Sequence, residues 1–404
     1  MKISKLPFRR KLFFIPGYDP FPPRRYRELY RSESAAQGAI SGYLVQMQPA
    51  ATRQKDAQTP YRWRAQGVMD GAICDLDAEV LIWSDIVKSS MPNGILATYG
   101  QMLQTLWIYA ASGAFFRQIR LRRGPALAAI YPVLVLALQA VVAGLIGGAV
   151  GWGFSHLHPA LAAVGLLAAY GVLRAAKAYD HRIFAHYLMH DFAFSARHWG
   201  DYPPALSDRM AQFTAKIRAA LDEDYDEVLI VGHSSGAYMG VTVLADLLRA
   251  GVPDTRPEIS LLTLGQVVPM VSFLPRAWRL RADLHDCSQR ADITWVDVTA
   301  PGDACAFALC DPVAVTGVAP AQQRWPLILS CAFSNTLAPD TWAKLRYRFF
   351  RLHCQYLYAF DRAGHYDYFR ITAGAKTLAQ RYAGMAPSPQ RITRALSHYR
   401  TMTP

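Results

Sequence analysis

The sequence lacks the residue patterns of several common functional classes. Its six cysteines include no C-x-x-C pair among 404 residues, which argues against a zinc site or a disulfide framework and fits a reducing compartment. No glycine-rich phosphate-binding loop follows a strand-like run. The basic residues are not interleaved with an aromatic stripe, as they are in proteins that read nucleic acid. We therefore expect no cofactor, no metal and no nucleic acid partner.

Acidic residues are also few. The chain has 30 Asp and Glu residues against 43 Lys and Arg residues, which gives a formal net charge of +13. Such a balance suits an anionic membrane surface or an acidic substrate. An ordinary basic protein whose genome favours Arg over Lys would have the same balance.

One long segment, from Ala126 to Leu173, contains no Asp, Glu, Lys or Arg. Residues 126–150 provide the length of about 20 residues that a bilayer span needs, residues 151–158 supply a turn, and residues 159–173 form a second, shorter apolar run. We expect an inserted hydrophobic helical hairpin in the membrane, rather than a buried hairpin of a soluble protein. Basic residues flank both of its ends, namely Arg117, Arg120, Arg122 and Arg123 before it and Arg174, Lys177 and Arg182 after it.

These flanks predict the orientation of the hairpin. By the positive-inside rule, both of its ends lie in the cytoplasm, so we expect an inner-membrane protein whose remaining domain faces the cytoplasm. The first helix also has two overlapping G-x-x-x-G spacings, Gly144 with Gly148 and Gly147 with Gly151. Such spacings allow helices to approach closely. Packing within the hairpin is the interpretation we favour over dimerisation, and the oligomeric state stays open.

The rest of the chain alternates between strand-like and helix-like runs. This order predicts an α/β fold with a mainly parallel sheet flanked by helices. Residues 1–100 and 201–404 would form the two parts of the α/β domain, and residues 101–200 would form the membrane hairpin and a cap-like insertion. The expected strands cover residues 11–15, 61–68, 78–83, 227–231, 258–265, 293–299 and 345–352, and the expected helices cover residues 24–42, 204–221, 237–249 and 373–382.

The strongest local signal is the G-x-S-x-G motif from Gly232 to Gly236. It follows the β-rich run Val228–Val231 and precedes a helix-like run, which is the context of a nucleophile elbow. Ser234 would then be a nucleophile at the N-terminus of a helix. The backbone N–H of Ser235 would form half of an oxyanion hole, and Gly17 and Tyr18, in the loop after the first strand, would supply the other half.

In these features, and in the run from Leu261 to Gly265, the chain resembles the α/β-hydrolase superfamily, particularly its lipase-like and esterase-like members. The resemblance covers most of the chain except residues 100–200, where the superfamily tolerates inserted caps. It implies a catalytic triad in the chain order Ser, then Asp or Glu, then His.

The acid and the base of such a triad are sought in late loops. Asp303 lies just past the expected strand 293–299 and is our choice over Asp297, inside that strand, and Asp311, further along. Two histidines compete for the role of base. His353 would leave the expected last strand directly, and we favour it over His365, which lies in a turn-like stretch.

A second histidine pattern has a different meaning. His186 and His190 are four residues apart and would share a helix face, as metal ligands can. Since no further histidine box follows, we expect two interfacial histidines. Three function classes remain open: a membrane-tethered serine hydrolase of acyl esters or lipids, an acyltransferase with the same triad, and a noncatalytic membrane protein that retains the fold.

Overall fold

An eight-stranded sheet organises the chain, and its strand order is β2-β3-β4-β1-β5-β6-β7-β8. The computed structural model describes residues 6–48, 61–91, 94–252 and 257–404. β1 and β4–β8 pair in parallel, whereas β2 and β3 extend the sheet as antiparallel strands. The strands are β1 (Phe8–Ile15), β2 (Leu44–Met47), β3 (Tyr61–Met69), β4 (Ala72–Val80), β5 (Glu227–His233), β6 (Glu258–Leu264), β7 (Ile293–Thr299) and β8 (Leu327–Ser330).

The central strands are apolar on both faces, as expected for a sheet covered on both sides. In β1, Phe13 packs in one core cluster and Phe14 in the other, and in β5 Ile230 and Val231 divide in the same way. The helices of the first face are α9 (Pro204–Ala220), α10 (Ser235–Arg249), α11 (Val268–Ser272), α12 (Trp278–Gln289) and α13 (Pro312–Thr316).

The second face is covered by α1 and by the C-terminal part of the chain. Its helices are α1 (Arg24–Ser41), α14 (Phe333–Thr336), α15 (Pro339–Leu345), α16 (Phe349–His353), the 3-10 turn η2 (Gln355–Leu357), α17 (Tyr368–Ala373) and α18 (Leu378–Arg381). The predicted α/β class and the mostly parallel sheet are therefore confirmed.

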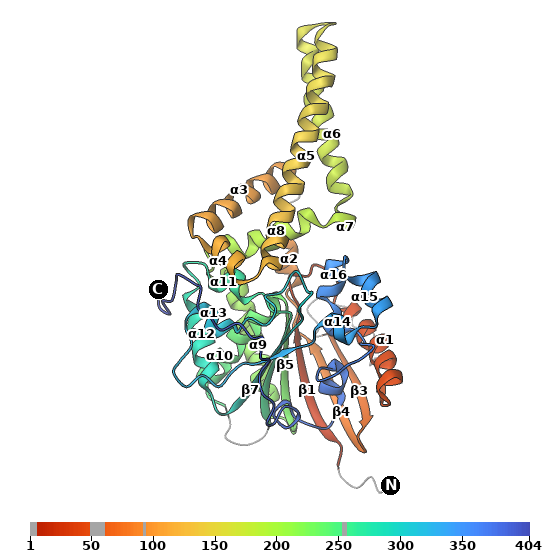
Figure 1. Cartoon of the computed structure of the whole chain (residues 1–404), viewed down its shortest axis with the longest axis vertical. Coiled ribbons are helices and arrows are strands. Elements are labelled where there is room, and N and C mark those ends of the chain that lie inside the picture. The colour runs from red at the N-terminus through yellow and green to blue at the C-terminus, as the bar shows by residue number, and fades with distance from the viewer. Residues whose placement is uncertain (1–5, 49–60, 92–93, 253–256) are drawn as a thin grey trace.

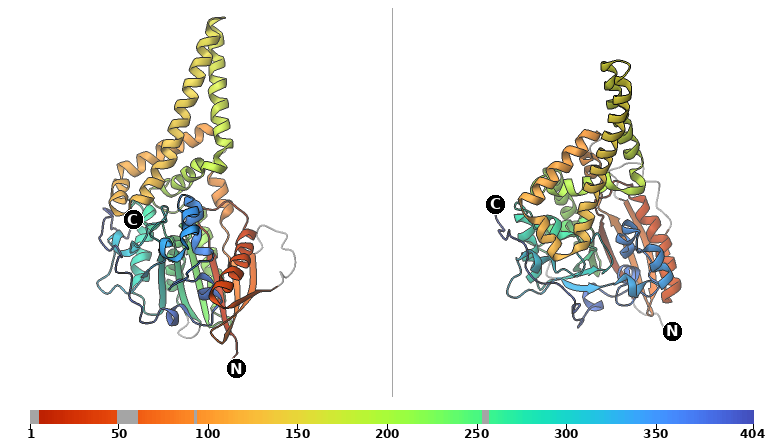
Figure 2. Two further views of the ribbon diagram at one scale, coloured as in Figure 1. Left: turned by 45° about the vertical axis from the view of Figure 1, so that its right-hand side comes forward. Right: turned by 45° about the horizontal axis from the view of Figure 1, so that its top comes forward.

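The chain between β4 and α9 forms an insertion at one end of the sheet (Figures 1 and 2). It contains α2 (Ser84–Ser90), α3 (Ile95–Ala111), α4 (Ala114–Leu121), α5 (Arg123–Ser155), η1 (Pro159–Ala163), α6 (Val164–Ala178), α7 (Asp180–Ile183) and α8 (Ala185–Ala196). α5 and α6 project away from the domain as a hairpin, and α3, α4 and α8 lie between the hairpin and the sheet.

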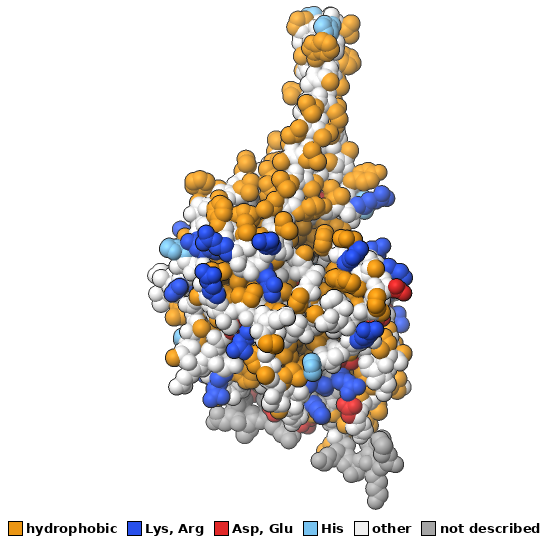
Figure 3. All heavy atoms as spheres, viewed as in Figure 1, with side chains coloured by type: hydrophobic (Ala, Val, Ile, Leu, Met, Phe, Trp, Pro, Cys, Tyr) orange, Lys and Arg blue, Asp and Glu red, His pale blue; other side chains and the backbone are white. Residues whose placement is uncertain are grey.

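Two segments of the insertion are long and apolar enough to cross a membrane, α5 with 33 residues and Pro159–Ala178 with 20 residues. Apolar side chains cover the visible surface of the hairpin, and Lys and Arg side chains gather on the domain below it (Figure 3). The first turn of α5 belongs to the domain, because Ala126 is buried there. Further along α5, the Leu136 carbonyl accepts a hydrogen bond from the Tyr99 hydroxyl of α3 at 2.9 Å.

Four predicted elements differ from the structure. The expected strand 78–83 is displaced, because β4 spans Ala72–Val80. The expected strand 345–352 is wrong, since this segment contains the end of α15 and most of α16. The expected turn 151–158 is too long, because α5 continues to Ser155 with Gly151 packed close to the Ala162 carbonyl of η1. The expected helix 373–382 is divided into α17 and α18, with extended backbone at Gly374 between them.

Candidate active site

Ser234 lies in the tight turn between β5 and α10. Its backbone has φ 57° and ψ −121°, a conformation that residues other than glycine rarely adopt. Its N–H donates to the Leu264 carbonyl of the neighbouring β6 at 2.9 Å, which fixes the turn to the sheet. The predicted strand–turn–helix around Ser234 is confirmed. The side chain therefore stands at the N-terminus of α10, where the helix dipole favours negative charge.

Glycines let three backbone segments meet at this serine. A Cβ on Gly232 would lie 2.3 Å from the Gly236 carbonyl oxygen, and a Cβ on Gly236 would lie 2.1 Å from the Ile15 carbonyl oxygen. A Cβ on Gly17 would lie 2.9 Å from the Cβ and 3.3 Å from the Oγ of Ser234. The β1–α1 loop is therefore in direct contact with Ser234, as the predicted oxyanion hole requires.

Polar contacts hold this loop in place. The Tyr18 hydroxyl shares a hydrogen bond of 2.6 Å with Ser90 Oγ, and the Tyr18 carbonyl accepts a hydrogen bond from the Tyr187 hydroxyl of α8. The Asp19 carboxylate has three partners, namely the Phe21 N–H at 2.9 Å, the Arg25 guanidinium at 2.6 Å and the Tyr26 hydroxyl. The loop is thus tied both to α1 and to the inserted α8.

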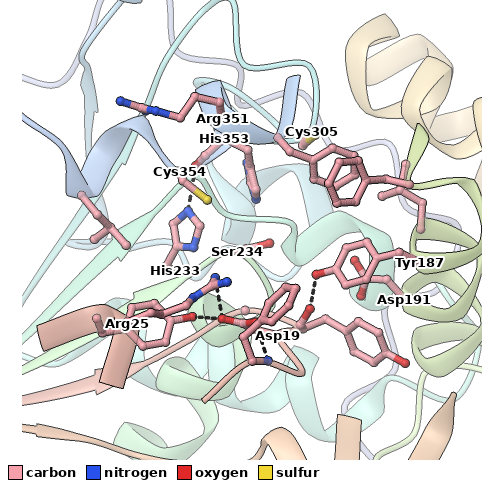
Figure 4. Close-up of a pocket in the computed structure, with 18 of the residues that line it drawn as sticks. Asp19, Arg25, Tyr187, Asp191, His233, Ser234, Cys305, Arg351, His353 and Cys354 are labelled. Atoms are coloured by element: carbon pink, nitrogen blue, oxygen red, sulfur yellow. Dashed lines mark hydrogen bonds and ion pairs between the residues drawn. The ribbon is translucent and has the colours of Figure 1, made fainter. Parts of the chain in front are cut away.

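Asp303 and His353 meet beside Ser234. His353 Nδ1 and Asp303 Oδ2 are 2.9 Å apart, and the same carboxylate oxygen accepts a hydrogen bond from the Tyr356 hydroxyl at 2.9 Å. Asp303 Oδ1 accepts the Cys305 N–H at 2.9 Å. Figure 4 shows the His353 ring directed towards Ser234. The three predicted residues, although far apart in sequence, are therefore brought to one site.

The electrostatics of the pair follow from burial and from their mutual contact. Burial opposes the charged form of His353, but the charge and the hydrogen bond of Asp303 outweigh it, and the pKa of His353 is raised. Burial likewise opposes the Asp303 carboxylate, but His353 and further hydrogen bonds outweigh it, and the pKa of Asp303 is lowered. The geometry thus favours an ionised Asp303 that holds a proton on His353 Nδ1.

His365 is not part of this arrangement. Its side chain is exposed in the stretch before α17, and it does not line the cavity that contains Ser234. His353 reaches the site from the end of α16, not from a strand as predicted. The structure therefore places His353, and not His365, beside Asp303 and in the cavity of Ser234, while the strand that was the reason for preferring His353 is wrong.

Two further residues that contact His353 or Asp303 were not predicted from the sequence. His233, inside the G-x-S-x-G motif, uses its Nε2 to contact the His353 carbonyl at 2.8 Å. Burial, with the adjacent His353, lowers the pKa of His233 to about 3, so it is a neutral hydrogen-bond donor. Tyr356 supports Asp303 from η2. The G-x-S-x-G motif indicates a role only for its serine and glycines, and no sequence pattern near Tyr356 indicates a role for it.

A cavity of about 840 Å³ opens at Ser234. It is lined by Gly17, Tyr18, Ser234 and His353, and also by Asp191 of α8. Figure 4 shows Arg25 and His233 on one side of Ser234 and Tyr187 and Asp191 on the other. Its apolar lining includes Phe184, Leu188, Phe192, Met270 and Phe350, and it reaches Ala128 near the start of α5. The insertion therefore forms part of the wall of the cavity.

One group of side chains in the described residues could hold a metal ion, and it includes Asp303 and His353. The ligand atoms of Asp303, Cys305 and His353 lie within 4.8 Å of one another. Burial raises the pKa of the Cys305 thiol well above its ordinary value, which disfavours the thiolate that a metal would bind. The pair of Asp303 and His353 therefore fits proton transfer better than metal coordination.

His186 and His190, the two histidines that are four residues apart on α8, have separate partners. His186 Nε2 is 3.3 Å from Gln139 Oε1 of α5, and His190 Nδ1 is 2.8 Å from Gln101 Oε1 of α3. These contacts join α8 to the hairpin and to α3.

Comparison of the chain with protein-family models, with curated proteins and with solved structures found no match. The mixed, mostly parallel sheet flanked by helices is compatible with the α/β-hydrolase fold. What can support a function for this chain is therefore the geometry of its site.

Proposed function

We propose that the protein is a membrane-tethered serine hydrolase that cleaves an acyl ester through Ser234, His353 and Asp303. This proposal rests on the hydrogen bond of 2.9 Å between His353 Nδ1 and Asp303 Oδ2. His353 lines the same cavity as Ser234, whose backbone is strained. This is the arrangement in which a carboxylate orients an imidazole that activates a hydroxyl. Resemblance to the α/β-hydrolase superfamily supports the same function.

In the proposed reaction, Ser234 Oγ attacks the ester carbonyl carbon and His353 Nε2 accepts the hydroxyl proton. The N–H groups of Tyr18 and Ser235 stabilise the oxyanion, and the imidazolium is stabilised by Asp303. His353 then donates its proton to the departing alkoxide, which leaves an acyl-enzyme on Ser234. Water, activated by His353, attacks this acyl group and releases the acid, and His353 returns the proton to Ser234.

The location of the cavity supports a substrate from the membrane. Its apolar lining extends to Ala128 of α5, the helix that continues into the hairpin. Basic residues flank the hairpin on both sides and the charge-free segment lies between them. On the positive-inside rule, the domain faces the cytoplasm of a cell whose inner membrane holds the hairpin. An acyl chain would then reach Ser234 from the adjoining leaflet.

The proposal is tested by labelling with a fluorophosphonate, which reacts with activated serines. We expect the wild type to be labelled and to hydrolyse a short p-nitrophenyl ester, and Ser234→Ala to lose the label and on the order of 10⁴-fold or more of the activity. Ser89→Ala, at an exposed position of α2, is the matched control.

Retention of most of the activity in Ser234→Ala, with the variant folded, would contradict the proposal. Absence of labelling in the wild type would point to a noncatalytic protein that retains the fold. Product analysis with a competing alcohol identifies acyl transfer, because an acyltransferase forms a new ester where a hydrolase forms the free acid.

A further inference from the structure

Asp191 is an unpartnered carboxyl group in the wall of the cavity. It lies on α8, in the insertion, and lines the same space as Ser234 and His353 (Figure 4). Its Oδ1 atom has no access to solvent and no hydrogen-bond partner. Within the described residues, no hydrogen bond or ion pair to the Asp191 carboxyl group is found, and the residue as a whole is half-buried. The catalytic steps proposed above do not use it.

Two fully buried carboxyl groups elsewhere in the described residues are less isolated. Asp283 and Asp297 also have one oxygen without a partner. The second oxygen of Asp283 accepts a hydrogen bond from Arg249 at 2.6 Å, and that of Asp297 accepts one from Thr263 at 2.6 Å. Neither of these residues lines the cavity. Asp191 differs from them in both respects.

A carboxyl group without a partner is costly in a protein interior. A polar atom that has neither access to solvent nor a hydrogen-bond partner destabilises a fold, and more strongly if its group is charged. Such groups are therefore expected to meet a partner that is absent from the free protein. The surroundings of Asp191 do not supply such a partner. Burial raises the pKa of Asp191 to about 7, and the opposing effect of the nearby His353 charge is smaller.

We propose that Asp191 binds a free hydroxyl group on the alcohol part of the ester substrate, as in a partial glyceride or another polyol ester. The inference rests on the proposed function and specifies its substrate. A saturated acyl chain has no hydrogen-bond donor, so the donor must belong to the alcohol part. The carboxyl group accepts a hydrogen bond from the hydroxyl when ionised and can also donate one when protonated, so it can bind a hydroxyl in both states.

Two esters of one acid test the proposal. Octanoate esters of 2-hydroxyethanol and of n-propanol have nearly the same size, and they differ by a hydroxyl in place of a methyl group. We expect the wild-type protein to prefer the hydroxyethyl ester by about tenfold or more in kcat/KM, since a site built to hydrogen-bond a hydroxyl discriminates against the analogue that lacks it. Asp191→Leu, of similar size, should abolish or reverse this preference through loss on the hydroxyethyl ester, and Asp191→Asn should retain part of it.

Asp297→Asn is the matched control, because it alters a buried carboxyl group outside the cavity, and it should keep the wild-type preference. Equal loss on both esters in Asp191→Leu and in Asp191→Asn would assign Asp191 a structural role and overturn the proposal. An absent preference in a wild-type protein whose Ser234 is labelled by fluorophosphonate would overturn the role of Asp191 alone. A wild-type protein with neither labelling nor hydrolysis would overturn the proposed function, and the assignment of Asp191 with it.

Discussion

The contact between His353 and Asp303 makes a direct comparison of two histidines possible. His353→Ala removes the group that would accept the Ser234 proton, so we expect a loss of about 10⁴-fold in kcat for a p-nitrophenyl ester. His365→Ala changes an exposed side chain that does not line the cavity, and its activity should stay close to that of the wild type. Steady-state kinetics of the two purified variants, with circular dichroism to check folding, measure the difference. Selective loss in His365→Ala would overturn the assignment.

The raised pKa of His353 also determines the direction of the pH dependence. Burial lowers this pKa, while Asp303, and to a smaller extent Asp191, raise it above the ordinary 6.5. The base must be neutral to accept a proton, so kcat/KM should rise with pH, with a midpoint above 6.5.

In Asp303→Asn the charge that stabilises the imidazolium is lost while the burial remains. The midpoint of this variant should therefore move to lower pH, and its maximal rate should also fall. A pH–rate profile of both proteins is the measurement. An unchanged midpoint in Asp303→Asn would show that the Asp303 charge does not act on His353.

The residues of the candidate site differ in how far they could be predicted from the sequence. Ser234 was predictable because local chemistry defines its turn: a β-rich run, glycines at fixed positions and a helical run. Asp303 was predictable because it lies just past β7. His233, Tyr356 and Asp191 were missed, since their roles depend on contacts between segments that are distant in sequence.

At the level of helices and strands, buried and strongly apolar runs were predictable and edge segments were not. β5 and β7 were found because both are continuous buried runs. The segment 345–352 has the aromatic composition of a strand, yet the sheet ends at β8, a strand of only 4 residues. Phe350 instead packs against Phe184 of the segment between α7 and α8, with 4.5 Å between the ring centroids. Tertiary packing therefore overrode the local preference for strand.

The two glycine spacings of α5 face different surroundings. A Cβ on Gly147 would lie 2.6 Å from the Gly165 carbonyl oxygen of α6, whereas a Cβ on Gly148 would have nothing within 4 Å. We therefore expect Gly147→Ile to separate the two helices of the hairpin and Gly148→Ile to leave them packed.

Hydrogen exchange of the α5 and α6 amides in detergent micelles measures the effect. Faster exchange in Gly147→Ile than in Gly148→Ile is the expected result. The reverse order would place the helix contact on the other face. A change in oligomeric state confined to Gly148→Ile would show that the outer glycine face pairs with a second copy of the chain.

On the scale of the whole molecule, the cavity depends on parts of the chain that the sequence places far apart. The β1–α1 loop, α5, α8, the turn after β5 and α16 all contribute to its wall. The insertion therefore has two roles, since α5 and α6 extend outward as the hairpin while the start of α5 and α8 shape the site. The composition of the sequence predicted the hairpin. It could not predict that the cavity extends to the helices at the base of the hairpin.

This division of roles determines how the proposed membrane anchor can be removed. Replacing the whole charge-free segment 126–173 would also delete Ala128 of the cavity wall and the contact of Gln139 with His186. Replacing residues 142–172 by a short Gly/Ser linker keeps both and removes the outer part of α5 and α6. We expect this variant to be found in the soluble fraction, with none left on the membranes after a high-salt wash. It should also retain fluorophosphonate labelling of Ser234.

Once the hairpin is removed, membrane binding by a second apolar surface should become detectable. One side of α3 exposes Leu96, Leu103 and Trp107, with 85%, 63% and 67% of these residues accessible, and their spacing puts them on one helix face beside the base of the hairpin. An apolar helix face of this kind binds at a bilayer interface. The variant lacking residues 142–172 should therefore still bind anionic vesicles weakly in a flotation assay, and adding Leu96→Gln, Leu103→Gln and Trp107→Gln should abolish that binding. If the shortened protein remains with the membranes as firmly as the full chain, and still does so after the three substitutions, neither the hairpin nor α3 is the membrane anchor.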